Sequence, residues 1–425
     1  MAAIQQPRGV RDLDLDEALF RSIIISDIER VYRRYGFNIM ETAYLESLSL
    51  IKERTIGDDN IKDIIKVEGE DSFLRFDQTL SLARYVATNN SIPMPLKRYS
   101  IGRVWRNDEP QRMRYREFTQ ADIDIVGSDS IYSDAEVISC LYEALSTIGV
   151  KPIVKLNDRK IYDLLLDKLN IKDMKTRLDA LRVIDKLGKI SKEDAADRLS
   201  KLNIGSDTVN EILNFALYEG DNEKKLTYIA DVTGEASAKR LKELIDILKG
   251  YGLLNNSIEI DLSIIRGLDY YTGVIFEIKD PRESLTVAAG GRYDKLVSVY
   301  ANRDVPMVGG SIGVDRVEAI LFDKRLNKLK TLTNVYIAFI NDNNYRYALD
   351  LLNYLRSKGI NADINLNKRN ITHQIEYASS LKIRYIVIIG NDEQSASKYR
   401  LKDLESGEEK LLTREELLNE LVNAK

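Results

Sequence analysis

A run of arginines is the first feature of the sequence whose residue types could do chemistry. Residues 97–116 carry seven basic side chains against two acidic ones, in a chain whose formal net charge is −4. Six of the seven are arginines, whose planar guanidinium groups can hold a phosphate or a carboxylate with two hydrogen bonds at once. Taken alone, such a run is equally typical of a solvated surface. The segment that follows it favours the anion-binding interpretation.

That segment alternates polar and apolar residues with a period of two, which predicts a β-strand with two different faces. The apolar face consists of Ala121, Ile123 and Ile125. The opposite face carries Arg116, Phe118, Gln120, Asp122 and Asp124. An aromatic ring followed by an amide and carboxylates suits a purine stacked on Phe118, with polar recognition further along the strand. The alternative is an ordinary half-solvated sheet surface.

Three glycine-containing clusters follow later in the chain: 266–273 with an arginine and paired tyrosines, 290–295, and 309–316, in which a glycine-rich strand leads into a helix. None fits the phosphate-binding GxxxxGK[ST] loop, so a P-loop ATPase is excluded. The chain has one histidine, His373, and one cysteine, Cys140. Catalytic triads and Cys/His zinc clusters would all have to use these two residues, so the chemistry must depend on Asp, Glu, Arg, Tyr and Gln.

Length and composition set the frame in which these residues must be positioned. The 425 residues include 44% hydrophobic and 31% charged side chains and only 7 prolines, which indicates a globular chain of more than one domain. The apolar runs are too short to cross a bilayer, and the first residues have no apolar signal core. A single cysteine cannot form an intrachain disulfide. We therefore expect a cytoplasmic protein without a membrane segment.

The hydrophobic pattern predicts the elements of the first part of the chain. Helical spacing runs over 15–35 and 131–148, and short strands are expected at 37–42 and 153–156. Two extended runs, 97–105 and 116–126, are joined by a polar loop and predict a long antiparallel hairpin. Residues 160–250 show helical periodicity throughout.

Strands are expected again at 258–264, 272–278 and 285–289, the last ending in a turn at Gly290 and Gly291. The tail alternates strand and helix over 335–389, which predicts a small doubly wound domain. The predicted division is a catalytic core in two parts, 1–160 and 251–326, interrupted by a helical insertion at 161–250 and followed by a separate domain at 331–425.

Taken together, five ordered segments resemble the class II aminoacyl-tRNA synthetases, and among them the histidyl-tRNA synthetases. The segments are 7–13, similar to that family's N-terminal signature; 74–79, similar to its substrate-amine segment; 106–127, similar to motif 2; 266–273, similar to the histidine-specific signature; and 311–316, similar to motif 3. The resemblance implies an α+β fold. Its six-stranded antiparallel sheet is flanked by helices, with an all-α insertion and a C-terminal α/β domain like those that bind anticodons.

The resemblance also implies roles for individual residues around ATP. Arg106 matches the family's arginine on the α-phosphate and the amino-acid carboxylate, and Arg266 a second arginine near the α-phosphate; these two are the expected catalytic residues. Arg114 and Arg316 match positions that hold the outer phosphates. The adenine is expected between Phe118 and Arg316. The expected ATP-binding set is Arg106, Asp108, Arg114, Phe118 and Arg316.

The expected histidine site is implied in the same way. Asp77, Thr79 and Gln120 match positions that hold the substrate α-amino group, while Asp124 and Tyr271 match those that bind the two imidazole nitrogens. The full histidine-binding set is Asp77, Thr79, Arg106, Gln120, Asp124, Arg266, Tyr270 and Tyr271.

The function implied by the resemblance is that of a histidine–tRNA ligase. Its expected substrates are ATP with Mg²⁺, L-histidine and tRNA(His), and it is expected to act as a homodimer. The sequence identifies no ligands for Mg²⁺ and no role for His373. The alternative is a histidine-sensing regulatory paralogue of ATP phosphoribosyltransferase. Such paralogues typically lack the tail domain and the catalytic arginines, whereas Arg106, Arg114, Arg266 and Arg316 are all present here.

Overall fold

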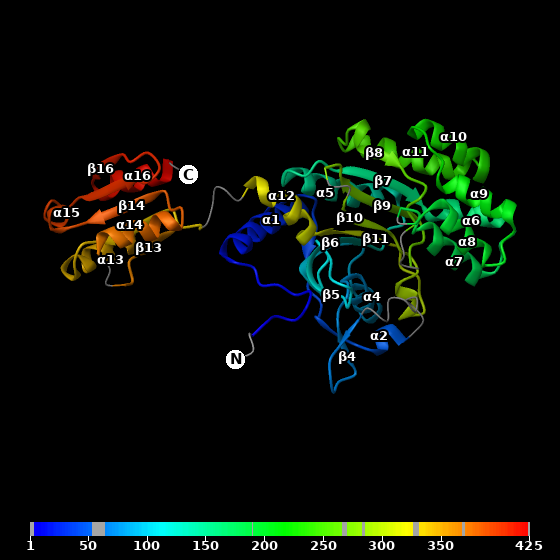
Figure 1. The fold of residues 1–425 in the computed structure, drawn as a ribbon, viewed down its shortest axis with the longest axis horizontal. Coiled ribbons are helices and arrows are strands. Elements are labelled where there is room, and N and C mark those ends of the chain that lie inside the picture. The colour runs from blue at the N-terminus through cyan, green and yellow to red at the C-terminus, as the bar shows by residue number, and fades with distance from the viewer. Residues whose placement is uncertain are drawn as a thin grey trace. The chain divides into compact units, whose positions relative to one another are not determined.

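The computed structural model describes residues 4–52, 64–188, 190–265, 270–282, 285–325, 331–367 and 370–423. They form two compact units, one made of Met1–Arg11 and Ile23–Leu321 and the other of Asp12–Ser22 and Phe322–Lys425. Figure 1 labels most of the helices and strands of both units.

An eight-stranded sheet forms the centre of the first unit, in the order β1-β5-β6-β11-β10-β9-β7-β8. In that order the strands are Asn38–Ile39, Leu96–Trp105, Glu117–Val126, Met307–Gly313, Leu285–Arg292, Val274–Asp280, Ile153–Asp158 and Ile258–Ile260. The six strands from β5 to β7 are antiparallel to their neighbours, whereas β1 and β8 pair in parallel at the two edges. The six-stranded antiparallel sheet expected from the motifs is thus present, with one short strand added at each side.

The hairpin predicted from the alternating runs is confirmed as β5 and β6, which pair along their whole length from Leu96↔Val126 to Trp105↔Glu117. Behind it, helix α5 (Ile131–Thr147) packs against β11, β10, β9 and β6. Its inner face is apolar and buried, including Val137, Ile138 and Leu141. The predicted helices at 15–35 and 131–148 are confirmed as α1 (Leu15–Arg34) and α5, while the strand expected at 37–42 is reduced to the two residues of β1.

The turn predicted at Gly290 and Gly291 is wrong. Both glycines lie inside β10 and pair with Gly310 and Gly309 of β11. A Cβ atom at Gly290 would lie 2.5 Å from Gly310 Cα and nearer still to the Gly309 carbonyl oxygen. These glycines therefore allow two central strands to approach closely, instead of reversing the chain.

Smaller elements complete this part of the unit. A second sheet and its neighbourhood consist of β2 (Leu45–Ser47), β4 (Ser72–Leu74), β3 (Ile65–Lys66), α2 (Ser49–Lys52), α4 (Thr79–Thr88) and the 3₁₀ turn η2 (Val297–Val299). The 3₁₀ turn η1 (Asn255–Ser257) instead contacts β7 at the edge of the central sheet. Helix α4 packs on η2, and its buried side chains join one hydrophobic cluster with Phe73, Tyr271 and Tyr293. Helix α4, which follows Asp77, is therefore anchored in this cluster.

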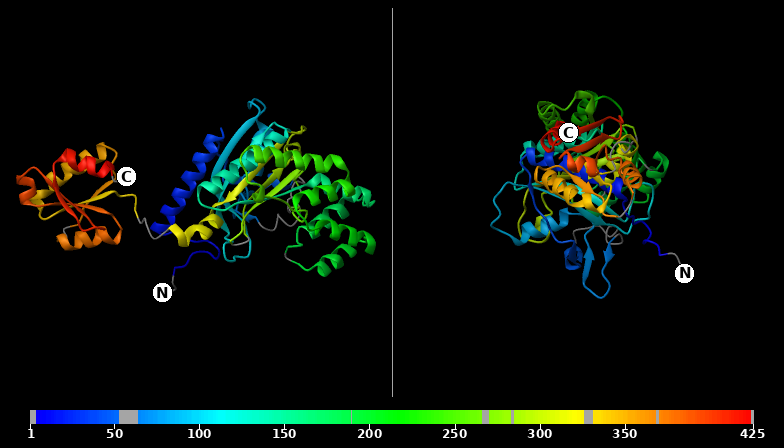
Figure 2. Two further views of the ribbon diagram at one scale, coloured as in Figure 1. Left: turned by 90° about the horizontal axis from the view of Figure 1, so that it is seen from above. Right: turned by 90° about the vertical axis from the view of Figure 1, so that its left-hand side faces the viewer.

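Between β7 and η1 the described residues form helices only: α6 (Arg159–Lys168), α7 (Met174–Ile184), α8 (Lys192–Ser200), α9 (Ser206–Ala216), α10 (Asn222–Thr233) and α11 (Glu235–Gly250). Four of them begin at a side chain that accepts a backbone N–H, namely Asp158, Asp173, Ser191 and Asp221. Figure 2 shows these green helices gathered beside the sheet. Helix α11 packs on α5, where Arg240 forms ion pairs with Asp134 and Asp158.

The second unit contains a five-stranded sheet in the order β13-β12-β14-β15-β16. Its elements are β12 (Val335–Phe339), η3 (Asp342–Asn344), α13 (Tyr345–Ser357), β13 (Ala362–Ile364), α14 (Ile371–Ser380), β14 (Tyr385–Ile389), α15 (Asn391–Ser395), β15 (Tyr399–Asp403), β16 (Glu409–Leu412) and α16 (Arg414–Asn423). The predicted strand–helix alternation is confirmed for β12 to β14. The antiparallel pair β15 and β16 and the last two helices had not been predicted.

His373 lies in the first turn of α14. Its backbone N–H donates to Asn370 Oδ1 at 3.0 Å, and its exposed ring contacts Glu376, 2.9 Å away. It is an ordinary helix-start residue. None of the described helices has the length and apolar character that crossing a bilayer requires.

Candidate active site

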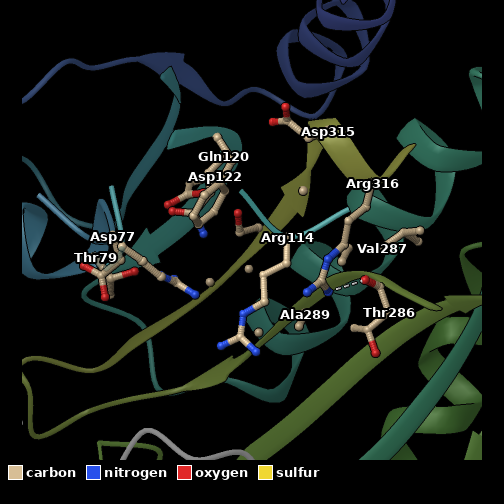
Figure 3. Close-up of a pocket in the computed structure, with 18 of the residues that line it drawn as sticks. Asp77, Thr79, Arg114, Gln120, Asp122, Thr286, Val287, Ala289, Asp315 and Arg316 are labelled. Carbon is tan, nitrogen blue, oxygen red and sulfur yellow. Dashed lines mark hydrogen bonds between the residues drawn. The ribbon is translucent and has the colours of Figure 1, made fainter. Parts of the chain in front are cut away.

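One cavity of about 310 Å³ opens on the face of the central sheet formed by β6, β10 and β11. Eleven of the twelve residues predicted from the sequence line it: Asp77, Thr79, Arg106, Asp108, Arg114, Phe118, Gln120, Asp124, Tyr270, Tyr271 and Arg316. The twelfth, Arg266, lies outside the described residues. Figure 3 shows side chains from α4, β6, β10 and α12 (Val314–Arg325) surrounding the same space.

Strand β6 supplies the polar side of the cavity. Phe118, Gln120, Asp122 and Asp124 all line it, as the period of two predicted. The two carboxylates are only 3% and 2% exposed, so the interpretation as a half-solvated surface is wrong for this part of the strand. Arg116 falls outside the cavity and pairs with Asn107.

Three arginines line the cavity. Arg106 Nε donates to the Phe76 carbonyl oxygen at 3.1 Å, and its guanidinium carbon lies 5.1 Å from the centre of the Phe118 ring. Arg114 forms a two-pronged pair with Asp108, with N–O distances of 2.9 and 2.8 Å. The Arg114 side chain remains half exposed. Both guanidinium groups are thus oriented before any ligand arrives.

The third arginine is held by the start of helix α12. Arg316 Nη1 donates to the Thr286 carbonyl oxygen at 2.8 Å, as the dashed line in Figure 3 shows. One residue earlier, Asp315 accepts the Thr119 backbone N–H at 2.7 Å, which fastens the helix to β6. Asp315 also lies 3.6 Å from Arg11 of the N-terminal segment. The start of the helix is therefore attached to β6 through Asp315, while Arg316 is hydrogen-bonded to Thr286 of β10.

The seven basic side chains of 97–116 do not form one surface patch. Arg106 and Arg114 face the cavity, whereas Lys97 pairs with Glu136, and Arg103 with Glu117 at 2.6 Å. Arg98 is directed inward and is only 2% exposed. Strand alternation therefore separates charges that are close together in the sequence.

The inner part of the cavity is acidic. Asp77 precedes α4, where its Oδ1 accepts the Leu80 N–H at 3.0 Å. Its second oxygen, Oδ2, has no hydrogen-bond partner among the described residues. Burial raises the pKa of this carboxyl, an effect opposed by the Leu80 N–H and by Arg106.

Asp124 is held from two sides. Arg98 Nη2 lies 2.7 Å from its Oδ2, and the Tyr293 hydroxyl donates to its Oδ1. Burial raises the pKa of Asp124, and both partners act in the opposite direction. Tyr293 belongs to a group of three tyrosines, with ring centres 5.6 Å from that of Tyr270 and 6.3 Å from that of Tyr271.

The floor under Asp124 is made of backbone. A Cβ atom at Gly309 would lie 2.5 Å from the Tyr293 hydroxyl and 2.7 Å from Asp124 Cγ. Any larger residue at this position would fill the space beside the carboxylate. Both β10 and β11 carry glycines here, and because glycine has no side chain, the inner cavity has room for a ligand.

Comparison with known proteins connects this geometry to a family. A family model described as histidyl-tRNA synthetase matches residues 9–317, and one described as anticodon binding domain matches residues 334–424. The first alone covers more than half of the chain. The chain belongs to the histidyl-tRNA synthetase family. The family and the enzyme class predicted from the sequence motifs are confirmed.

Individual relatives of this synthetase agree along its full length. The histidine–tRNA ligase of Thermococcus kodakarensis is 33% identical and aligns over 100% of this chain and 99% of its own. The crystal structure of histidyl-tRNA synthetase from Nostoc sp. PCC 7120 superposes with a TM-score of 0.87 at 28% identity, covering 100% of both chains. A Bacillus halodurans C structure described as an ATP phosphoribosyltransferase regulatory subunit/histidyl-tRNA synthetase has a TM-score of 0.75 at 20% identity, covering 91% of this chain and 97% of its own. At that identity the last match shows the fold alone.

Sequence reasoning missed two groups of this synthetase's site, Arg98 and Tyr293. Arg98 looked like one more member of a charged run, and the only signal that separates it is its position opposite Asp124 in the hairpin register. Tyr293 follows the glycine pair that had been predicted as a turn. A continuous β10 would have placed Tyr293 directly after the strand and next to the site.

Proposed function

We propose that this chain is a histidine–tRNA ligase that activates L-histidine with ATP to histidyl-adenylate and then transfers the histidyl group to the 3′ end of tRNA(His). The observation that carries the proposal is the meeting of three arginines with a buried acidic and tyrosine-lined recess in one cavity. The arginines suit the phosphates of a nucleotide and the carboxylate of an amino acid, and the acidic recess suits the amino group of that amino acid.

The first step needs no general base. The histidine carboxylate is ionised at neutral pH and attacks the α-phosphorus of ATP, while the bond from that phosphorus to the bridging oxygen breaks and diphosphate leaves. The protein must bring two anions together and stabilise the charge that develops. Arg106 suits this role because Phe76 and Phe118 hold its guanidinium in place. Arg266 shares the role on the strength of the sequence motif.

The arginines of the cavity suit the rest of the nucleotide. Arg114 and Arg316 are placed to hold the outer phosphates, with Asp108 orienting Arg114. The adenine is proposed to lie between Phe118 and Arg316. The Arg106 guanidinium lies over the Phe118 ring, 5.1 Å from its centre. This contact supports a role of the ring as a stacking surface.

The acidic end suits histidine. Asp77, Thr79 and Gln120 are proposed to bind the α-amino group, and Asp124, Tyr270 and Tyr271 to enclose the imidazole. The locked position of Asp124 supports this assignment, because a carboxylate fixed by Arg98 and Tyr293 cannot swing to fit a different side chain. Groups that bind ring nitrogens also reject side chains that lack them, since the buried groups would stay unpaired.

Mg²⁺ enters this proposal only with the nucleotide. The described residues contain no group of three acidic, cysteine or histidine side chains that could hold a metal ion. Mg²⁺ is often bound through one or two carboxylates together with substrate phosphates and water, so the absence of an all-protein site fits an ion that arrives on ATP. It would neutralise phosphate charge there.

We further propose the division of labour expected from the sequence. Residues 1–160 and 251–326 make the adenylate, the helical insertion at 161–250 contacts tRNA, and residues 331–425 read the anticodon. A homodimer in the cytoplasm completes this proposal. The second unit has a hydrophobic core of its own around Val335, Leu351 and Val387, which supports a separate role for it.

The regulatory alternative is less well supported. The Bacillus halodurans C structure, whose description names both an ATP phosphoribosyltransferase regulatory subunit and a histidyl-tRNA synthetase, has the same fold, so the fold alone favours neither function. Two features of this chain favour the enzyme. Residues 334–424 match an anticodon-binding domain, and Arg106, Arg114 and Arg316 meet in one cavity.

Charging of tRNA(His) with labelled histidine tests the proposal. The full chain is expected to charge the tRNA, whereas a chain lacking 331–425 should still form the adenylate but charge the tRNA far more slowly. A chain that binds histidine and never charges tRNA would be a sensor. Equal charging by both chains would show that residues 331–425 are not needed for tRNA recognition.

A further inference from the structure

Five buried oxygen atoms of cavity-lining side chains have no hydrogen-bond partner among the described residues: Asp77 Oδ2, Gln120 Oε1, Asp122 Oδ1, Asp124 Oδ2 and Ser311 Oγ. Asp124 Oδ2 lies in an ion pair with Arg98, and the Ser311 hydroxyl can itself donate. The oxygens of Asp77, Gln120 and Asp122 are therefore the three that offer a ligand only an acceptor. All three side chains line the same cavity, and Figure 3 shows them together on the side away from Arg316. A buried acceptor without a donor is costly, so a ligand is expected to supply the missing N–H groups.

Asp122 is the member of this group to which the motifs assign no role. It is 3% exposed and lies on the cavity face of β6 between Gln120 and Asp124. The neighbouring strands place serines opposite it, Ser100 on β5 and Ser311 on β11, and the Ser311 hydroxyl acts against the effect of burial on its pKa. Burial raises the pKa of Asp122 to about 7, the value expected of a carboxyl without adequate compensation.

Arg98 lowers the pKa of Asp122, but its close ion pair is with another carboxylate. Arg98 Nη2 lies 2.7 Å from Asp124 Oδ2, the carboxylate directly opposite it in register. Asp77 adds a third carboxylate nearby, and Arg75 and Arg106 also act on this group of carboxylates. A cationic ligand group would give Asp122 a direct partner of its own.

The three unsatisfied acceptors match the chemistry of an ammonium group, which has three N–H donors and no acceptor. We propose that Asp122 is a substrate-binding residue that accepts a hydrogen bond from the α-ammonium group of bound histidine, together with Asp77 and Gln120. This inference rests on the proposed function and extends it, because the family motifs assign the α-amino group to Asp77, Thr79 and Gln120 only.

The other N–H source in histidine is the imidazole ring. The position of Asp122 favours the ammonium. Asp122 lies two residues from Gln120 and two residues from Asp124 on the same face of β6. The tyrosines proposed to enclose the imidazole are grouped around Tyr293, which donates to Asp124 and not to Asp122. A substrate analogue without the amine distinguishes the two sources.

The test is a binding cycle with two ligands and two proteins. Calorimetry measures the affinity of L-histidine and of its des-amino analogue, 3-(imidazol-4-yl)propionate, for the unmodified chain and for Asp122→Asn. Loss of a charge-assisted hydrogen bond is expected to weaken histidine binding about tenfold or more. The des-amino analogue should bind both proteins equally, within about twofold, since it has no ammonium to lose.

Two results would overturn the inference. Equal weakening of both ligands would assign Asp122 to the ring or the carboxylate, and unchanged histidine binding would leave it without a substrate contact. Asp122→Ser serves as a second variant if the asparagine variant does not fold. Asp280→Asn is the matched control, because Asp280 is completely buried, pairs with Arg282 and lies outside the cavity; it should not alter histidine affinity.

Failure of the proposed function would look different. Histidine-dependent exchange of diphosphate into ATP by the unmodified chain tests that function, independently of Asp122. If exchange occurs and the binding cycle shows no coupling, only the role of Asp122 is lost. If the cycle shows coupling without exchange, the chain recognises the histidine ammonium but does not activate the amino acid.

Discussion

Arg98 and Asp124 lie directly opposite each other on β5 and β6, with 2.7 Å between Arg98 Nη2 and Asp124 Oδ2, and both are at least 97% buried in their side chains. An ion pair this deep is costly to form and more costly to break, because removal of one partner leaves a buried charge without compensation. Arg98 therefore holds the acidic end of the cavity ready for a ligand.

Arg98→Met should lower the free energy of unfolding by about 3–5 kcal/mol, since Asp124 would lose its only close cation among the described residues. Urea titration at pH 7 measures this change. Arg103→Ala on the same strand is the control, because its pair with Glu117 is largely exposed and is expected to contribute under about 1 kcal/mol. Similar losses of unfolding free energy in both variants would show that the buried Arg98–Asp124 pair stabilises the fold no more than an exposed pair does.

Gly290→Ala should destabilise the central sheet severely, because the new methyl group would collide with the backbone of β11 and with the Phe276 ring 2.6 Å away. Gly313→Ala near the end of β11 should be tolerated, as its Cβ would find no atom nearer than 3.7 Å. Thermal unfolding of the two purified variants compares them. A normal melting temperature for Gly290→Ala would contradict the close approach of the two strands.

These glycines also show where prediction from sequence succeeded and where it could not. The alternation over residues 116–126 predicted both the strand and its functional face, because a period of two is a local property. A glycine pair is also a local signal, and the rule that it marks a turn led to the wrong assignment at Gly290 and Gly291. Only the partner strand, itself glycine-rich, reveals why glycine is required there.

The site followed the same pattern. The motifs placed eleven residues that meet in the cavity, whereas Arg98, Tyr293 and the unsatisfied oxygen of Asp122 depend on strand register and burial. Arg98 and Arg103 have the same charge and lie five positions apart in one run, yet one is buried and the other exposed. No property of the run itself distinguishes them.

The stability of Asp122→Asn should exceed that of the unmodified chain at alkaline pH. The pKa of Asp122 is raised to about 7 by burial, with Arg98 and Ser311 lowering it and Asp124 and Asp77 raising it. A raised acid pKa means that the folded state holds the proton more tightly than the unfolded state, where the pKa is about 3.9. The associated stability is present below about pH 4 and is lost as pH rises through about 7.

The melting temperature of Asp122→Asn should therefore increasingly exceed that of the unmodified chain between pH 5 and pH 8. Asp280→Asn should behave in the opposite way, because Arg282 holds the pKa of Asp280 below its usual value against the effect of burial, so that variant loses a stabilising charge. A fall in melting temperature for Asp122→Asn at pH 8 would mean that the carboxylate is well compensated.

Arg106→Ala should reduce kcat for diphosphate exchange about 100- to 1,000-fold, the usual effect of removing one preorganised donor from a charged transition state. The fold should survive, because the side chain contributes one hydrogen bond and one ring contact. Arg112→Ala tests for a general charge effect, since Arg112 is exposed and outside the cavity. Comparable losses in both variants would remove Arg106 from the reaction.

The central claim is that one cavity joins a nucleotide to histidine and to no other amino acid. The most direct measurement is exchange of labelled diphosphate into ATP by the purified full chain, with each of the twenty amino acids supplied in turn. We expect rapid exchange with histidine and background exchange with the other nineteen. Tight histidine binding without exchange, or exchange with a different amino acid, would contradict it.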